Sequence, residues 1–191
     1  MMSETTIGVS GQIGSFSEEA ALRYAKKMNI MASLTYLIDM ESVLAAVEEK
    51  TVEIGIFPVV NLYGGLVKPA FEAMGKHLFT PIDELWLDVK QCLLVLPGTG
   101  VEQIKKIVSH TQALSQCKNY LKNNFSEAEL IPWIDTAQAA KELSEGKFSA
   151  ATAVIAPARS AEVYCLDVMA ENIQDNSSNL TAFIIAKKRD S

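Results

Sequence analysis

The sequence predicts an α/β protein of two lobes, each a mostly parallel sheet covered by helices. Short apolar segments of strand type alternate along the chain with segments of helical periodicity, an order typical of parallel sheets with helices on their faces. The alternation is interrupted at Pro97-Gly98-Thr99-Gly100, which divides the chain into two sets of strand–helix units. We therefore expect a first lobe of residues 1–96 plus 173–191, a second lobe of residues 97–172, and a cleft between them.

The first lobe begins with strands and helices in alternation. In the predicted helix Ser17–Met28, residues Ala20, Ala21 and Tyr24 recur on one face, as expected of a helix that packs on a sheet. Pro58 ends the third strand and opens a glycine-containing loop. The strands predicted here are Thr6–Val9, Leu34–Ile38 and Ile54–Phe57, the helices are Ser17–Met28 and Glu41–Glu49, and Leu78–Leu96 is extended.

The second lobe repeats the alternation after the Pro-Gly break. Its strands are predicted at Ile104–Val108, Leu130–Ile134 and Ala150–Ile155, and its helices at Gln112–Lys122, Ala137–Leu143 and Ala158–Tyr164. The final strand, Asn179–Lys187, is assigned to the first lobe, so the chain crosses between the lobes twice. Two-lobed α/β proteins bind small ligands at the carboxyl ends of their strands, and we expect the same here.

Composition and charge restrict the class of function. A net charge of −6 argues against general nucleic-acid binding, which needs a basic face. No apolar run approaches the roughly 20 residues that span a bilayer, so no membrane association is expected. The N-terminus lacks a basic and then apolar signal segment. Three widely spaced cysteines, Cys92, Cys117 and Cys165, form no CxxC pair and indicate a reduced, cytoplasmic protein.

Polar residues lie at three junctions where a predicted strand is followed by a predicted helix. These junctions are Gly14-Ser15-Phe16-Ser17, Ser109-His110-Thr111 and Asp135-Thr136. The unpaired N–H groups and partial positive charge of a helix N-terminus favour anions. Helix capping alone explains such residues at any one junction. Three converging junctions favour a small carboxylate ligand.

Other catalytic signals are few. His77 is interpreted as a surface or structural residue, whereas His110 lies at a junction and could donate a hydrogen bond or a proton. The sequence contains no nucleophile elbow, P-loop, HExxH motif or zinc-ligand spacing, so no metal and no cofactor are expected. Cys117 is predicted to be a buried small hydrophobe.

The order of several short motifs resembles that of prephenate dehydratases. Asn179–Phe183 is similar to the family's Thr-Arg-Phe segment, and Ser109–Cys117 to its Ser-His-Pro-Gln segment, with Thr111 in place of proline. The resemblance extends to Gly11–Ala21, Gly55–Gly65, Gln91–Val95, Thr136–Ala140 and Ala151–Leu166. It thus covers nearly the whole chain.

This resemblance implies two α/β lobes like those of periplasmic binding proteins and a lyase of phenylalanine biosynthesis. The family converts prephenate to phenylpyruvate with loss of water and carbon dioxide. Thr181 would supply a hydrogen bond or proton to the leaving hydroxyl. The dicarboxylate substrate would be bound by Ser15, Phe16, Asn61, Ser109, His110, Thr136, Asn179 and Phe183. A homodimer is expected, without a chorismate mutase or a regulatory domain.

Besides Glu18, which stands where the family often has histidine, three positions of the expected site depart from the family pattern. Ala182 stands where the family has arginine, Val60 where it has glutamate, and Leu62 where it has a hydroxyl residue. The arginine is the family's best candidate for handling an anionic substrate. If it faced the glutamate, loss of both would cost the fold less than loss of one. Three functions therefore remain open: a dehydratase, a decarboxylase-like enzyme that does not aromatise the ring, and an inactive protein that binds small carboxylates.

Overall fold

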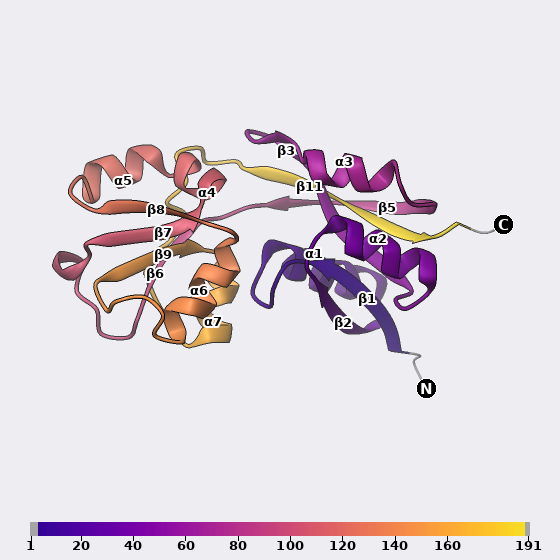
Figure 1. Ribbon diagram of the computed structural model, residues 1–191, viewed down its shortest axis with the longest axis horizontal. Coiled ribbons are helices and arrows are strands. Elements are labelled where there is room, and N and C mark those ends of the chain that lie inside the picture. Colours follow the sequence, from indigo (N-terminus) through magenta and orange to yellow (C-terminus); the bar gives the residue numbers. More distant parts are fainter. Residues whose placement is uncertain (1–3, 190–191) are drawn as a thin grey trace. The chain divides into compact units, whose positions relative to one another are not determined.

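The structure is a computed structural model that describes residues 4–189 and divides into two units (Figure 1). Unit 1 contains the segment that ends at Gln12, the segment Phe16–Asp88 and the segment that begins at Asn179. Unit 2 contains Ile13–Ser15 and Val89–Ser178. From the sequence, the boundaries between the two lobes are expected at residues 96 and 173. The strand Cys92–Val95 instead lies in unit 2, because it pairs with strands of that unit.

Unit 1 is built on a mixed sheet with strand order β2-β1-β3-β11-β5, and a short strand β4 pairs with β3. Strand β1 pairs in parallel with both β2 and β3, whereas β11 is antiparallel to both β3 and β5. Its strands are β1 (Glu4–Ser10), β2 (Met31–Leu37), β3 (Ile54–Asn61), β4 (Gly65–Leu66), β5 (Phe79–Asp88) and β11 (Leu180–Lys188). Its helices are α1 (Phe16–Met28), α2 (Met40–Glu49) and α3 (Lys68–Met74).

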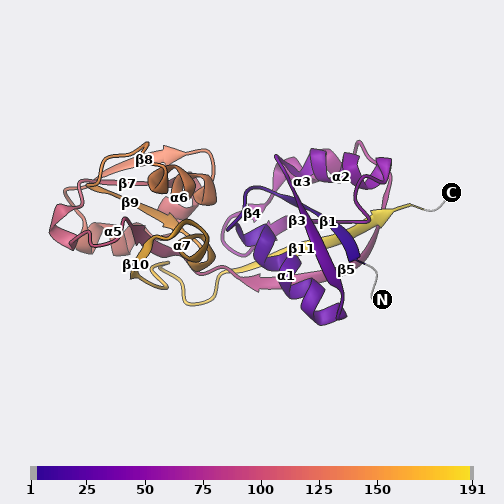
Figure 2. The ribbon, with the colours of Figure 1, turned by 90° about the horizontal axis from the view of Figure 1, so that it is seen from below.

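Helices cover both faces of this sheet, as Figure 2 shows. On one face, α1 buries Ala20, Ala21 and Tyr24 against a cluster that includes Phe183 and Leu87. On the other face, α2 and α3 pack over a second cluster. That cluster comprises Val43, Leu44, Phe57, Val59, Ala70, Ala73, Ala182 and Ala186. Because strand side chains alternate between the faces, consecutive residues of β11 belong to different clusters.

Unit 2 contains a five-stranded sheet of order β10-β6-β9-β7-β8. Strands β7, β8 and β9 are parallel, and β6 and β10 add antiparallel pairs. Its strands are β6 (Cys92–Val95), β7 (Lys106–His110), β8 (Glu129–Trp133), β9 (Thr152–Ala156) and β10 (Asp167–Ala170). Its helices are the 3-10 turn η1 (Val101–Gln103), α4 (Thr111–Gln116), α5 (Lys118–Asn124), α6 (Thr136–Ser144) and α7 (Ala158–Tyr164).

The predicted α/β class is confirmed, and each sheet combines three parallel strands with antiparallel ones. The antiparallel strands β5, β6 and β11 lie next to the crossings between the units. Of the described residues, none belongs to a helix long and apolar enough to cross a membrane.

Two element boundaries differ from the sequence predictions for identifiable reasons. Strand β3 continues through Pro58 to Asn61 instead of ending before the proline. Pairing of β3 with β1 stops at Ile56, and the register with β11 shifts between Ala182 and Phe183, so Pro58 lies at a bulge where its missing N–H is tolerated. The predicted helix 112–122 is divided at Cys117 into α4 and α5.

Candidate active site

A buried polar cluster lies where β3 ends and β11 begins. The two strands are antiparallel, and their register places Asn61 directly opposite Thr181. Asn61, Asn179 and Thr181 are only 5%, 1% and 7% exposed. Residues separated by well over a hundred positions in the sequence are therefore brought together by strand pairing. We refer to these three residues as the Thr181 cluster.

Asn61 is the centre of the Thr181 cluster. Its Nδ2 donates to Thr181 Oγ1 at 2.8 Å and to Asn179 Oδ1 at 2.8 Å. A longer approach of 3.4 Å joins the same nitrogen to the carbonyl oxygen of Leu180. Its Oδ1 accepts the backbone N–H groups of Tyr63 at 3.1 Å and Gly64 at 2.7 Å. Asn61 thus closes the turn after β3 and at the same time holds Thr181.

Asp88 supports this cluster from the end of β5. Its Oδ1 accepts the backbone N–H of Asn179 at 2.9 Å, just before β11 begins at Leu180. Sequence reasoning missed Asp88. Asp88 can accept this hydrogen bond because β5 pairs with β11. No local pattern in the sequence indicated this contact.

The junction before α1 is divided between the two units. Phe16 begins α1 and packs against the unit 1 cluster around Phe183. Ser15 is buried and belongs, with Ile13 and Gly14, to unit 2. There the carbonyl of Gly14 accepts the hydroxyl of Ser160 at 2.9 Å, and the carbonyl of Ile13 accepts the hydroxyl of Tyr164 at 2.7 Å.

The close approach of this segment to α7 requires a glycine at position 14. Its φ is +85°, a conformation that side-chain-bearing residues rarely adopt. A Cβ at this position would lie 2.9 Å from Ser160 Oγ and 3.1 Å from Ser160 Cα. The sequence singled out this glycine only as part of an anion-binding junction, and its close approach to Ser160 was not predicted.

The other predicted substrate contacts lie at the carboxyl edge of the parallel strands of unit 2. His110 caps α4 and accepts the N–H of Gln112 through Nδ1 at 3.3 Å. Thr136 is the first residue of α6, whose N-cap is Asp135. Ser109 is fully buried, and its hydroxyl donates to the carbonyl oxygen of Ile155 at 2.6 Å. This hydrogen bond joins β7 to the neighbouring strand β9.

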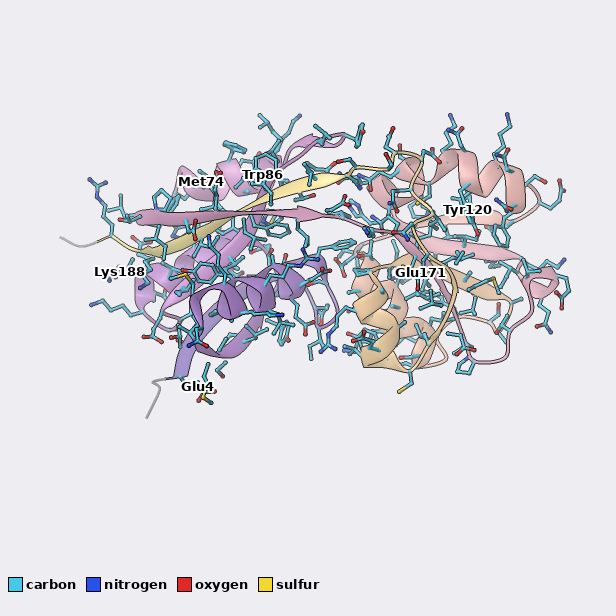
Figure 3. The ribbon with its side chains drawn as sticks, turned by 180° about the vertical axis from the view of Figure 1, so that it is seen from behind. Glu4, Met74, Trp86, Tyr120, Glu171 and Lys188 are labelled. Atoms are coloured by element: carbon cyan, nitrogen blue, oxygen red, sulfur yellow. The ribbon has the colours of Figure 1, made fainter. Side chains whose placement is uncertain are left out.

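Two of the altered positions, Val60 and Ala182, lie directly opposite each other on neighbouring strands. They are direct partners in the pairing of β3 with β11. The register continues on both sides, from Leu66 on β4 to Val60, to Ala182, and then to Trp86 on β5, which Figure 3 labels. Residues paired in this way project from the same face of a sheet. We call these four residues the apolar row.

The apolar row and the Thr181 hydroxyl lie on opposite faces of the sheet. Ala182 is 5% exposed and belongs to the cluster under α2 and α3. Its neighbours Thr181 and Phe183 pair with Leu87 and Leu85, which lie on the face covered by α1. Phe183 is 1% exposed within that core. Leu62, the third altered position, is exposed just beyond the end of β3.

Two of the three cysteines, Cys92 and Cys117, are buried, and Cys165 is exposed. Residues 4–189 contain no group of three or more potential metal ligands. Burial raises the pKa of the Cys117 thiol to about 12, so this residue is protonated at neutral pH and is not a nucleophile. Cys92 is also buried, and burial raises the pKa of its thiol.

Comparisons with known proteins match this fold and its motifs. A plant relative, arogenate dehydratase/prephenate dehydratase 1 of Arabidopsis thaliana, is 36% identical over 184 residues, which cover 96% of this chain and 45% of the relative. The chain thus spans about half the length of the curated relatives it matches.

Two solved structures share the fold. A prephenate dehydratase of Arthrobacter aurescens in complex with L-Phe superposes with a TM-score of 0.87 at 24% identity, covering 97% of this chain and 60% of that one. A periplasmic substrate-binding protein of an ABC transporter from Coxiella burnetii gives a TM-score of 0.52 at 16% identity, covering 96% and 84%. The periplasmic-binding-protein-like fold expected from the sequence is confirmed.

The match to a family model decides which family the chain belongs to. The family model described as prephenate dehydratase matches residues 7–191, a range that includes the Thr181 cluster. The resemblance inferred from the sequence motifs is confirmed, and the chain belongs to the prephenate dehydratase family.

Proposed function

We propose that this chain is a dehydratase that converts prephenate to phenylpyruvate with loss of water and carbon dioxide. The observation that supports this proposal is the Thr181 cluster, a buried hydroxyl held by Asn61 at 2.8 Å. The departures at Val60 and Ala182 lie on the other face of the sheet. The position of the changed family arginine, Ala182, is therefore on the face of the sheet opposite to this hydroxyl.

The chemistry requires the ring hydroxyl of the substrate to leave as water. A hydroxyl is a poor leaving group unless it receives a proton or a strong hydrogen bond in the transition state. Thr181 has an O–H group, and its oxygen already accepts a hydrogen bond from Asn61. We assign to Thr181 the donation of a hydrogen bond or proton to the departing oxygen. Decarboxylation then supplies the electron pair that completes the aromatic ring.

The substrate is a dicarboxylate, and we propose that helix N-termini contribute to its binding. Without an arginine at position 182, oriented N–H groups and partial helix charge remain to stabilise an anion. Ser15, Phe16, His110 and Thr136 stand at or next to such N-termini and are retained as proposed substrate contacts. Ser109, Asn179 and Phe183 are buried or hydrogen-bonded within their units, so we assign them supporting roles.

Arogenate is a second candidate substrate, because the relatives are named as arogenate and as prephenate dehydratases. We therefore propose assays of both compounds with the purified chain, with identification of the products by mass. Loss of water together with carbon dioxide supports the dehydratase. Loss of carbon dioxide alone would establish the decarboxylase-like reaction. Binding measured by calorimetry with neither product would indicate a carboxylate-binding protein.

The role of Thr181 is tested in the same assay with a matched pair of variants. Thr181→Val preserves the shape of the side chain and removes the hydroxyl, and we expect it to abolish product formation. Thr181→Ser keeps the hydroxyl and should retain measurable activity. Equal rates for the wild-type protein and Thr181→Val would remove Thr181 from the mechanism.

We further propose that the protein acts as a homodimer in the cytoplasm. The three cysteines in the described residues are free, which is consistent with a reducing compartment. The dimer is an expectation from the family resemblance. Light scattering after size-exclusion chromatography and localisation of the tagged protein test the two statements, and a monomer or an organellar signal would contradict them.

A further inference from the structure

We infer that Asn61 is a positioning residue that fixes the direction in which the Thr181 hydroxyl donates its proton. The inference rests on the proposed function, in which this hydroxyl serves the leaving group of the substrate. It changes the role expected for Asn61 from the sequence, where the residue is predicted to contact the substrate.

The orientation of the Asn61 amide is determined by its partners. The oxygen and nitrogen of an asparagine amide have similar shapes, so their positions must be assigned from hydrogen bonds. Here one end of the amide faces the backbone N–H groups of Tyr63 and Gly64, at 3.1 Å and 2.7 Å. Backbone N–H groups only donate, so this end must be the oxygen. The NH₂ group consequently faces Thr181 and Asn179.

This orientation dictates the role of the Thr181 oxygen. An amide NH₂ group has two hydrogens and only donates. Its two short contacts, both 2.8 Å, are to Thr181 Oγ1 and Asn179 Oδ1. Thr181 Oγ1 is therefore the acceptor, and the hydrogen of its own hydroxyl points away from Asn61. In a site where Asn61 is 5% exposed and Thr181 7% exposed, water competes little with this arrangement.

The same geometry makes Asn61 a poor substrate ligand. Both amide hydrogens and both acceptor positions of Asn61 are directed at other groups of unit 1. A substrate contact would have to displace one of these bonds. Asn61 instead acts through Thr181, by leaving the hydroxyl hydrogen available on the side away from the amide.

Asn61→Asp separates this role from the structural role of the side chain. The substitution keeps an oxygen for the N–H groups of Tyr63 and Gly64, so the turn after β3 is maintained. It replaces the donor NH₂ by a carboxylate oxygen, which accepts. The Thr181 hydroxyl then turns its hydrogen toward the carboxylate and can no longer donate it to the substrate. Asn61→Ala, which removes both functions, is the control for damage to the turn.

We expect Asn61→Asp to lower kcat about 10²-fold or more at neutral pH with little change in KM, since positioned proton donors contribute about 10²–10⁴-fold. Activity should recover as the pH falls, because protonation of the introduced carboxyl restores an O–H donor toward Thr181. The pH profile of the wild-type protein should lack this recovery. A raised KM with unchanged kcat, or a variant profile parallel to the wild type, would overturn the inference.

A second measurement does not depend on activity. In ¹⁵N-edited NMR spectra, Thr181→Val should move one of the two Asn61 side-chain amide protons upfield and speed its exchange, because its acceptor is removed. Thr181→Ser should preserve the wild-type shift. An Asn61 signal unaffected by Thr181→Val would refute the positioning role. If the wild-type protein makes no product from prephenate or arogenate, the proposed function fails, and the NMR result still decides this inference.

Discussion

We expect Ala182→Arg, which restores the arginine of the family motif, to destabilise unit 1 without raising the rate of a reaction at Thr181. Ala182 is 5% exposed and lies between Val60 and Trp86 in the apolar row. Forcing a larger side chain into a packed position costs about 1–3 kcal/mol. A guanidinium without a partner adds about 1–3 kcal/mol.

The partly exposed members of the apolar row limit this cost. Trp86 is 51% exposed and Leu66 is 62% exposed, so the stem of an arginine can extend over them and bring its charge toward solvent. We therefore expect a loss of about 2–3 kcal/mol in the free energy of unfolding, at the lower end of the combined range. Urea unfolding followed by circular dichroism measures this loss, and the product assay measures the rate.

Val60→Glu completes a double-mutant cycle with Ala182→Arg. Because residues 60 and 182 are direct cross-strand partners, the double variant should be more stable than the sum of the single effects by about 0.5–3 kcal/mol. Ala182→Met provides a long side chain without charge and should show no such coupling to Val60→Glu. Additive effects of the charged pair, or a faster reaction in Ala182→Arg alone, would show that residue 182 does not occupy the face described here.

Three further predictions concern stability away from Thr181. Gly14→Ala should cost about 1–3 kcal/mol in urea unfolding, since its φ of +85° and the approach of Ser160 both exclude a Cβ. Asp175→Ala should cost about 0.5–2 kcal/mol, because its carboxylate accepts N–H groups at the start of α5. The pKa of Glu48 is lowered below its ordinary value of 4.5, chiefly by the hydrogen bond to His77. The stability from this bond is therefore present above about pH 4.5 and lost as the pH falls further, so the difference in Tm between wild type and His77→Ala should shrink with acidification. A difference that is constant from pH 7 to pH 3 would contradict it.

Local periodicity was sufficient to predict most of the elements. The predicted helix Ala158–Tyr164 has the same bounds in the structure, and α1 buries the face that its small residues indicate. The elements that were missed are short. Helix α3 carries a proline in its first turn and spans only Lys68–Met74, and β10 spans Asp167–Ala170. Such segments offer too few turns or alternations for a periodic signal.

The candidate site was predictable only as a set of separate motifs. Thr181 and Asn179 were found through the closing motif, and Asn61 through the loop after the third predicted strand. That these residues form one hydrogen-bonded cluster depends on the antiparallel register of β3 with β11. The register depends in turn on a bulge near Pro58, where the sequence indicated the end of the strand. The contact of Asp88 with Asn179 could not be predicted from local sequence for the same reason, because it depends on the pairing of β5 with β11.

The position of Ala182 follows from a simple property of strands that could have been applied to the sequence. Consecutive residues of a strand project to opposite faces, so the side chains of Thr181 and Ala182 leave β11 on opposite sides. A change at one member of a motif therefore does not imply a change in the chemistry of its neighbour. In this chain the alanine is matched by Val60 across the sheet and by Trp86 on the other side, and together they form a consistent apolar surface. Replacement of both members of a buried charged pair by apolar residues costs little stability, whereas removal of one member is strongly destabilising. Val60 and Ala182 are thus changed together at one cross-strand pair, while the Thr181 hydroxyl next to them in β11 accepts a hydrogen bond from Asn61 at 2.8 Å.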